Sequence, residues 1–89
     1  MSQTIKDSES ILKKITNLIV ELGVDENKVL LESDLINDLN IDSLGKIELT
    51  MMLEEEFKSD SLKISEESSD KIKTVNDLVN YVVSAKLKK

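Results

Sequence analysis

A serine hydroxyl beside an acidic residue is the grouping in this chain whose position suggests chemistry. Ser43 lies in Asp42-Ser43-Leu44, where a loop is predicted to give way to an amphipathic helix over residues 43–57. The start of a helix presents unpaired backbone N–H groups at the positive end of its dipole, an environment that favours a phosphate. The chain has no His and no Cys, so neither an imidazole nor a thiol is present to make Ser43 a hydrolytic centre. These features predict a serine that receives a phosphate-linked group and performs no catalysis of its own.

Two simpler interpretations apply to the same residues. Asp and Ser are among the best helix-capping residues, so Asp42 and Ser43 could serve only as an N-cap. Asp38, Asn40 and Asp42 also imitate the first ligands of a calcium-binding loop. An EF-hand requires Gly at the sixth position and Glu at the twelfth, where this chain has Ser43 and Leu49. The calcium interpretation therefore fails and no metal site is predicted, whereas the cap remains the alternative to a modification site.

Negative charge is concentrated around Ser43. Residues 31–56 contain eight acidic residues against one lysine, Lys46, a net charge of −7, whereas the whole 89-residue chain carries −6. A field of this sign repels nucleic acid and anionic lipid and steers basic protein surfaces toward it. No apolar run approaches the roughly 18 residues of a membrane span, and the N-terminus lacks the features of a signal peptide. The composition predicts a monomeric cytoplasmic protein with basic protein partners, and neither nucleic-acid nor membrane binding.

The spacing of apolar residues predicts four helices and no strands. Their limits are given by local signals: a first helix that starts near Asp7 or Ser8 and stops at Gly23, a second over residues 43–57, a short third over 65–71, and a last one that opens at the capping-box sequence Thr74-Val75-Asn76-Asp77. Residues 1–7 could lie outside the ordered part of the domain. Residues 58–64 are expected to form a loop.

The long connection over residues 24–42 carries more large apolar residues than a plain solvent loop needs. Structureless loops of this length are uncommon in compact domains. The connection is therefore expected to pack across the helices, with a short helical turn near residues 33–38. The prediction is a single all-α domain over residues 1–89, a small four-helix bundle of three longer helices and one short helix, with a long loop between the first two.

The predicted second helix has two kinds of apolar residue. Its spacing assigns Ile47, Leu49, Leu53 and Phe57 to the side that faces the core. Leu44 and Met51 do not fit that stripe. Single exposed apolar residues are common on soluble proteins, so these two are either ordinary surface residues or contacts for a partner.

The run Asp38-Leu39-Asn40-Ile41-Asp42-Ser43-Leu44, followed by Ile47-Glu48-Leu49 and Met52-Leu53-Glu54-Glu55-Glu56-Phe57, resembles the acyl carrier proteins of the stand-alone type. The similarity extends from Leu22 to about Tyr81. In that family the serine of the Asp-Ser-Leu motif carries 4′-phosphopantetheine, and acyl groups are attached to the terminal thiol of this arm. The resemblance implies that Ser43 is the attachment site, and that Asp42 takes part in recognition by a phosphopantetheinyl transferase.

The resemblance also implies which residues meet partners and cargo. Basic docking patches of partner enzymes would contact Leu44, Ile47, Glu48, Met51, Glu54 and Glu55. An acyl chain would be shielded in a cleft lined by Leu53, Ile64, Ile72, Leu78 and Val79, for each of which plain core packing is the alternative. Three residues depart from the family pattern. Asn40 stands where Gly is common, and Gly45 and Lys46 replace residues that are often acidic or β-branched, which puts the identity of the transferase and the partners in doubt.

The predicted function is a non-enzymatic carrier that shuttles acyl thioesters among the enzymes of fatty-acid synthesis. Polyketide, lipid A and D-alanyl carriers share the motif and stay open. A different class is an unmodified acidic adaptor that binds a basic partner through residues 43–57. Without His or Cys, and without a pair of catalytic carboxylates, an enzyme is the least supported class.

Overall fold

The computed structural model describes the backbone of residues 2–87 and the side chains of residues 8–59 and 61–85. Within that part, the elements follow one another as α1 (Ser2–Glu21), η1 (Glu26–Lys28), α2 (Ser43–Glu56), η2 (Lys58–Asp60), α3 (Glu66–Lys71) and α4 (Val75–Leu87), where η denotes a single 3-10 turn. The predicted all-α bundle of three longer helices and one short helix is confirmed. Met1 lies outside the described residues. The backbone is helical from Ser2, so α1 starts earlier than the predicted start near Asp7 or Ser8.

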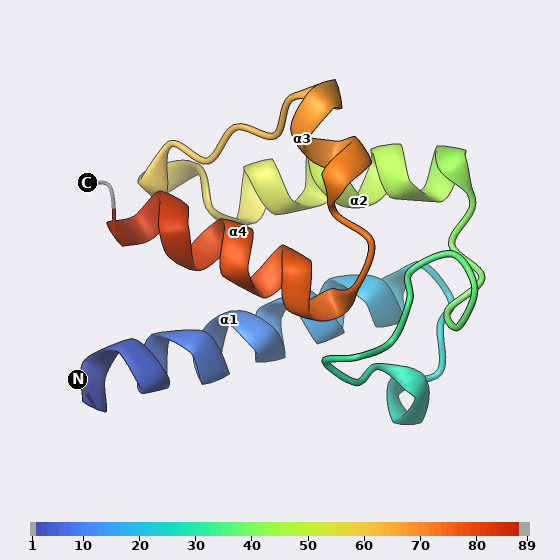
Figure 1. Ribbon diagram of the computed structural model, residues 1–89, viewed down its shortest axis with the longest axis horizontal. Coiled ribbons are helices and arrows are strands. Elements are labelled where there is room, and N and C mark those ends of the chain that lie inside the picture. Colours follow the sequence, from blue (N-terminus) through green and yellow to red (C-terminus); the bar gives the residue numbers. More distant parts are fainter. Residues whose placement is uncertain (1, 88–89) are drawn as a thin grey trace.

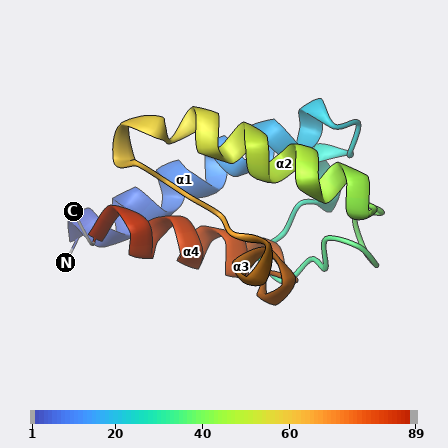
Figure 2. The same ribbon diagram turned by 90° about the horizontal axis from the view of Figure 1, so that it is seen from above.

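The three longer helices form the body of the bundle. α1 packs against both α2 and α4, and both of these run antiparallel to it (Figure 1). α1 therefore begins, and α2 and α4 end, at one end of the molecule, whereas α2 starts at the other end beside the long connection. Seen from above, α2 and α4 lie on either side of α1, and the short α3 lies beside α4 (Figure 2).

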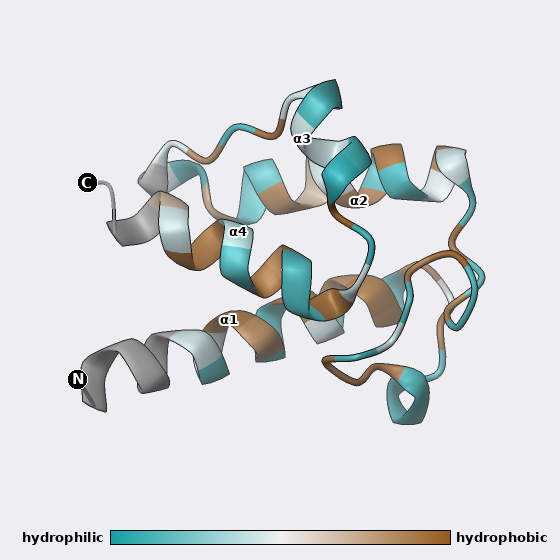
Figure 3. Ribbon diagram, viewed as in Figure 1, coloured by the Kyte–Doolittle hydropathy of each residue, from teal (hydrophilic) through white to brown (hydrophobic). Residues whose placement is uncertain are grey.

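Buried aliphatic side chains from every long helix make the core. Four-residue spacings place Ile11, Ile15 and Ile19 on the inner face of α1, and Leu49 and Leu53 on the inner face of α2. The hydrophobic stripes of α1 and α4 face each other in Figure 3. α1 ends where predicted, because Gly23 adopts a φ of +99° that L side chains rarely take.

The long connection is ordered, as predicted, and it lies across the bundle. Leu35, Leu39 and Ile41 are buried in the core. The predicted short helical turn is present, closed by the Asp38 N–H, which donates to the Asp34 carbonyl oxygen four residues earlier at 2.9 Å. The 3-10 turn η1 and the turn η2 were not predicted by the sequence, and η2 lies within the segment expected to be a loop.

Backbone hydrogen bonds tie this connection to the start of α4, a contact that the sequence did not predict. The Leu35 N–H donates to the Lys73 carbonyl oxygen at 2.9 Å, and the Val75 N–H donates to the Ser33 carbonyl oxygen at 3.1 Å. Between them, Asp34 and Thr74 form an isolated antiparallel bridge. The segment before α2 and the segment before α4 are thereby held side by side.

The capping box predicted for α4 is confirmed. The Asp77 N–H donates to the Thr74 hydroxyl at 3.1 Å, and the Thr74 N–H donates back to the Asp77 carboxylate at 3.2 Å. α3 also lies where expected, capped by the Ser65 hydroxyl, which accepts from the Ser68 N–H at 3.1 Å. The two caps fix the start of α3 and the start of α4 on either side of residues 72 and 73.

Candidate functional site

Ser43 is the first residue of α2, and its side chain is exposed. Asp42 is the N-cap, as predicted: its carboxylate accepts from the Gly45 N–H at 2.7 Å, and its carbonyl oxygen accepts from the Lys46 N–H at 2.8 Å. The cap is close enough that a Cβ at position 45 would lie 3.2 Å from the Asp42 carboxylate oxygen and 3.1 Å from Ile41 Cγ2. Because Asp42 caps the helix, the Ser43 hydroxyl is left free for other chemistry.

Three aspartates spaced four residues apart shape the backbone that leads to Ser43. Asp34 accepts from the Ile36 and Asn37 N–H groups at 2.9 and 2.8 Å, and Asp38 accepts from the Asp34 N–H at 2.7 Å. Asp42 then caps α2. All three carboxylates belong to the acidic segment 31–56, and two of them belong to the sequence that imitates a calcium loop. In the structure they accept hydrogen bonds from backbone N–H groups, as in Asx turns and helix caps.

Asn40 takes the left-handed conformation, with a φ of +57°. Asn tolerates this region better than other non-Gly residues. Asn40 therefore makes a left-handed turn at this position without a Gly. It directs the backbone from the buried Leu39 to the cap of α2, with Ile41 again buried.

Removing the Asp42 cap should destabilise the protein without touching Ser43. Asp42→Ala leaves the Gly45 N–H without its partner and is expected to lower the free energy of unfolding by about 1 kcal/mol. Asp42→Asn keeps a capping oxygen and should cost much less. Urea unfolding of the two variants measures the difference. Equal losses for Ala and Asn would show that the charge, and not the hydrogen bond, stabilises the start of α2.

The Asp34 carboxylate should make the stability of the protein sensitive to acid. The Asn37 N–H, followed by that of Ile36 and by the attraction of Lys73, holds the pKa of Asp34 below its ordinary value. A carboxyl whose pKa is lower in the folded than in the unfolded state stabilises the fold above its unfolded pKa, about 3.9. That contribution is lost as the pH falls through the lower, folded value. Asp34→Asn, which keeps an accepting oxygen, should flatten the loss of melting temperature below about pH 4; an unchanged pH profile would contradict this.

A cavity of about 690 Å³ opens beside Ser43, and we call it the Ser43 cavity. It lies between the turn that precedes α2, the first turns of α2, and α3 with the two residues after it. Its lining mixes apolar and charged side chains: Asp34, Ile36, Asn37, Ser43, Lys46, Ile47, Glu66, Ser69, Asp70, Ile72 and Lys73. Ile72, which was named for the acyl cleft, does line this cavity. Sequence reasoning did not single out Lys73, because the hydrogen bond that brings it close joins residues far apart in the chain.

The outer face of α2 carries exposed apolar side chains. Leu44, Ile47 and Met51 are 67%, 55% and 58% exposed. The assignment of Ile47 to the core is therefore wrong, whereas its assignment to the outer face with Leu44 and Met51 agrees with its exposure. Ile47 lies two residues before the buried Leu49, which on an α-helix is more than half a turn around the axis.

The acidic residues named as docking groups differ in their surroundings. Glu48 and Glu55 are exposed, and Glu55 forms an ion pair with Lys58 at 3.5 Å. Glu54 is half-buried, and it accepts a hydrogen bond from the Ile64 N–H at 2.8 Å. Glu54 therefore anchors the segment after η2 onto α2, a structural role that the sequence did not indicate.

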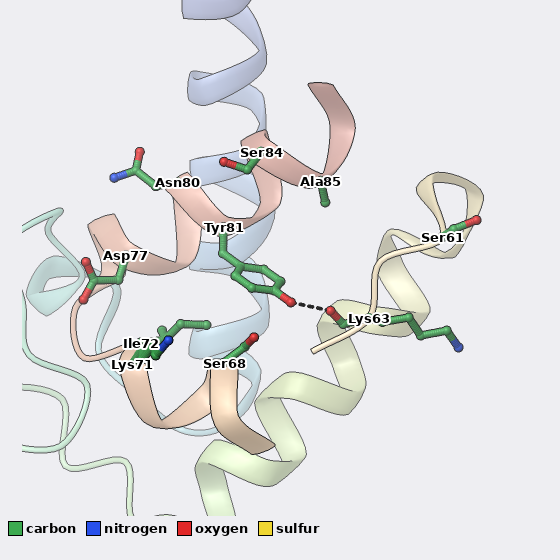
Figure 4. A pocket seen from close by; sticks show the side chains of 10 residues that line it. All are labelled: Ser61, Lys63, Ser68, Lys71, Ile72, Asp77, Asn80, Tyr81, Ser84 and Ala85. Carbon is green, nitrogen blue, oxygen red and sulfur yellow. Dashed lines mark hydrogen bonds between the residues drawn. The ribbon is translucent and has the colours of Figure 1, made fainter. Parts of the chain in front are cut away.

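Four of the five residues named for an acyl cleft are buried: Leu53, Ile72, Leu78 and Val79. Ile64 packs against this core and is partly buried. Ile72 lines the Ser43 cavity and also a second cavity of about 740 Å³ under α4. Figure 4 shows this second cavity, where the Tyr81 hydroxyl donates to the Lys63 carbonyl oxygen across the opening. Ser43 does not line it.

One comparison with known proteins matches most of the chain. The model of a family described as "phosphopantetheine attachment site" matches residues 13–82. The match contains α2 and α3, the C-terminal part of α1 from residue 13 onward and most of α4, and it includes every residue of the Ser43 cavity. Among the described residues, no helix is long and apolar enough to cross a bilayer.

Proposed function

We propose that this chain, which belongs to the phosphopantetheine attachment family, bears its arm on Ser43 and carries acyl thioesters between the enzymes of cytoplasmic fatty-acid synthesis. Family membership makes the chain a carrier of covalently attached 4′-phosphopantetheine rather than a catalytic domain. The observation that supports Ser43 as the attachment point is its exposure at the start of α2, with Asp42 supplying the cap in its place.

The residues around Ser43 fit such an arm. The Ser43 cavity, at about 690 Å³, is in the range of roughly 300–1,000 Å³ that small-molecule sites occupy. Ile36 and Ile47 offer apolar contacts and Lys46 and Lys73 offer positive charge, which suits a group with an anionic end and an organic body. When attached, the arm supplies the thiol that this chain lacks, because the sequence contains no Cys.

Loading the arm is a phosphoryl transfer carried out by another enzyme. The Ser43 Oγ attacks the β-phosphate of coenzyme A, a new O–P bond forms, and the adenosine 3′,5′-bisphosphate part leaves with the electrons of the broken P–O bond. The proton of the hydroxyl passes to a base of the transferase, which also supplies the metal. This chain has to offer an accessible hydroxyl, and Ser43 at the edge of α2 does so.

Docking to partners is proposed for the outer face of α2. Leu44, Ile47 and Met51 supply exposed apolar area. Glu48 and Glu55 supply exposed negative charge for a basic partner surface. Exposed ion pairs contribute only about 0–1 kcal/mol each. Such contacts favour fast association and release, which a shuttle requires. Glu54 belongs to this face in sequence, and its hydrogen bond to Ile64 limits its freedom to bind a partner.

Mass spectrometry tests the proposal directly. The protein is incubated with coenzyme A, magnesium and a phosphopantetheinyl transferase of broad specificity. A gain of one phosphopantetheinyl group, mapped by peptide analysis to Ser43, is expected. Acyl groups found on the arm of protein isolated from cells then separate fatty-acid synthesis from the polyketide, lipid A and D-alanyl pathways. No gain with several transferases, or a gain at another serine, would overturn the attachment site.

A further inference from the structure

Lys46 is the single lysine of the acidic segment 31–56, and it lies three residues after Ser43 on the same helix. Residues three apart share a helix face, and long helical side chains lean toward the N-terminus of the helix. Lys46 is half-buried and lines the Ser43 cavity together with Ser43. Its ammonium group is therefore carried on the side of α2 that faces the attachment point.

Lys73 reaches the same cavity from the other side. Its carbonyl oxygen accepts from the Leu35 N–H at 2.9 Å, and the bridge between Asp34 and Thr74 holds the adjacent residues together. These backbone contacts fix residue 73 opposite the start of α2. Lys73 is exposed and lines the Ser43 cavity, so two lysines from distant parts of the sequence flank one serine.

The charges of the cavity explain why the two lysines matter. Asp34, Glu66 and Asp70 line it as well, so a phosphodiester attached to Ser43 would add negative charge to a region that is already acidic. Of the described side chains, no carboxylate forms an ion pair with Lys46 or Lys73. Asp34 accepts hydrogen bonds from backbone N–H groups, and it attracts Lys73 without forming an ion pair with it. The two ammonium groups are thus available to an anion at this place.

We propose that Lys46 and Lys73 hold the phosphodiester on Ser43 and so keep the arm folded into the Ser43 cavity, with its organic body against Ile36 and Ile47. The inference rests on the proposed attachment at Ser43. It assigns the two lysines as positioning residues of the loaded protein, and it gives a role to Lys46, which departs from the family pattern.

Nuclear magnetic resonance tests this arrangement in the full chain. Amide spectra are compared before and after loading, and the phosphorus resonance of the phosphodiester is recorded. In the natural protein, loading should shift amide signals on the far side of the cavity, at Asn37, Ile72 and Lys73. In Lys46→Gln/Lys73→Gln those shifts should decrease, because the ratio of packed to free arm falls about two- to fivefold for each lysine removed. The phosphorus linewidth should narrow as the arm becomes freer.

A matched control removes the same charge elsewhere. Lys63 and Lys71 are exposed and line the second cavity under α4 instead, so Lys63→Gln/Lys71→Gln should keep the far-side shifts of the natural protein. Lys46→Arg/Lys73→Arg, which keeps the charge, should keep them largely as well. A salt series tests the same contact in the natural protein. The far-side shifts should diminish in about 1 M salt, because the screening length falls to about 3 Å and weakens the attraction between the lysines and the phosphodiester.

Several outcomes would overturn the inference. These are loading shifts confined to the neighbours of Ser43 in the natural protein, equal far-side shifts in the Lys46→Gln/Lys73→Gln and control pairs, or shifts that do not respond to salt. The mass gain is measured on every sample before its spectrum. A natural protein that gains no arm would contradict the proposed function, whereas a loaded protein without far-side shifts would contradict only the role of the lysines.

Discussion

Replacing Ser43 with alanine is expected to abolish loading completely, from one phosphopantetheinyl group per chain to none. The change removes the Oγ atom that would form the new bond. It leaves the fold intact, because Asp42 and not Ser43 accepts the capping hydrogen bond from Gly45. The intact mass after incubation with coenzyme A and transferase measures the effect, and circular dichroism confirms that the variant is helical.

A second serine at a helix start provides the control. Ser65 is exposed and caps α3 through its hydroxyl, so Ser65→Ala should lose some stability and load normally. Loading that persists in Ser43→Ala would place the arm elsewhere. The same variant distinguishes a carrier from an unmodified adaptor. Partner binding by an adaptor in cells should survive Ser43→Ala, and it should be lost in Glu55→Lys.

The largest expected effect on stability is at Leu53. This side chain is fully buried on the inner face of α2. Leu53→Ala removes apolar contacts and leaves a cavity, which costs about 2–5 kcal/mol. Domains of this size have only about 5–15 kcal/mol of stability in total, and small ones lie at the low end. The variant should therefore unfold at a much lower urea concentration.

Met51 gives the matched control on the same helix. It is 58% exposed, two residues before Leu53, so Met51→Ala should change the free energy of unfolding by less than about 0.5 kcal/mol. The same change should weaken binding to a partner that docks on the outer face of α2. Comparable losses of stability at the two positions would contradict the inward and outward faces assigned to α2.

Local signals made much of the fold predictable from the sequence. Gly23 ends α1, Asp42 caps α2, and Thr74 with Asp77 caps α4, because each signal acts over three or four residues. Helical spacing likewise identified the buried stripe of α1. Ile47 shows the limit of this reasoning: it was grouped with Leu49 and Leu53 on the core side, but its angular position on α2 turns it outward.

Contacts between distant segments could not be read from the sequence. The buried Ser33 side chain accepts from the Leu30 N–H and donates to the Lys28 carbonyl oxygen, whereas the Ser33 backbone bonds to the start of α4. Nothing in the composition of these segments encodes that pairing. It is also what brings Lys73 to the Ser43 cavity, so the charged lining of that cavity emerges only from the folded chain.

The Tyr81 hydroxyl, which donates to the Lys63 carbonyl oxygen between α4 and the segment before α3, gives the protein a built-in optical reporter. The sequence contains one Tyr and no Trp, so fluorescence at wavelengths longer than the emission of phenylalanine comes from this ring. A carbonyl acceptor bonded to the phenol alters its fluorescence. Any cargo that parts these two segments would register as a change in emission, with no label attached.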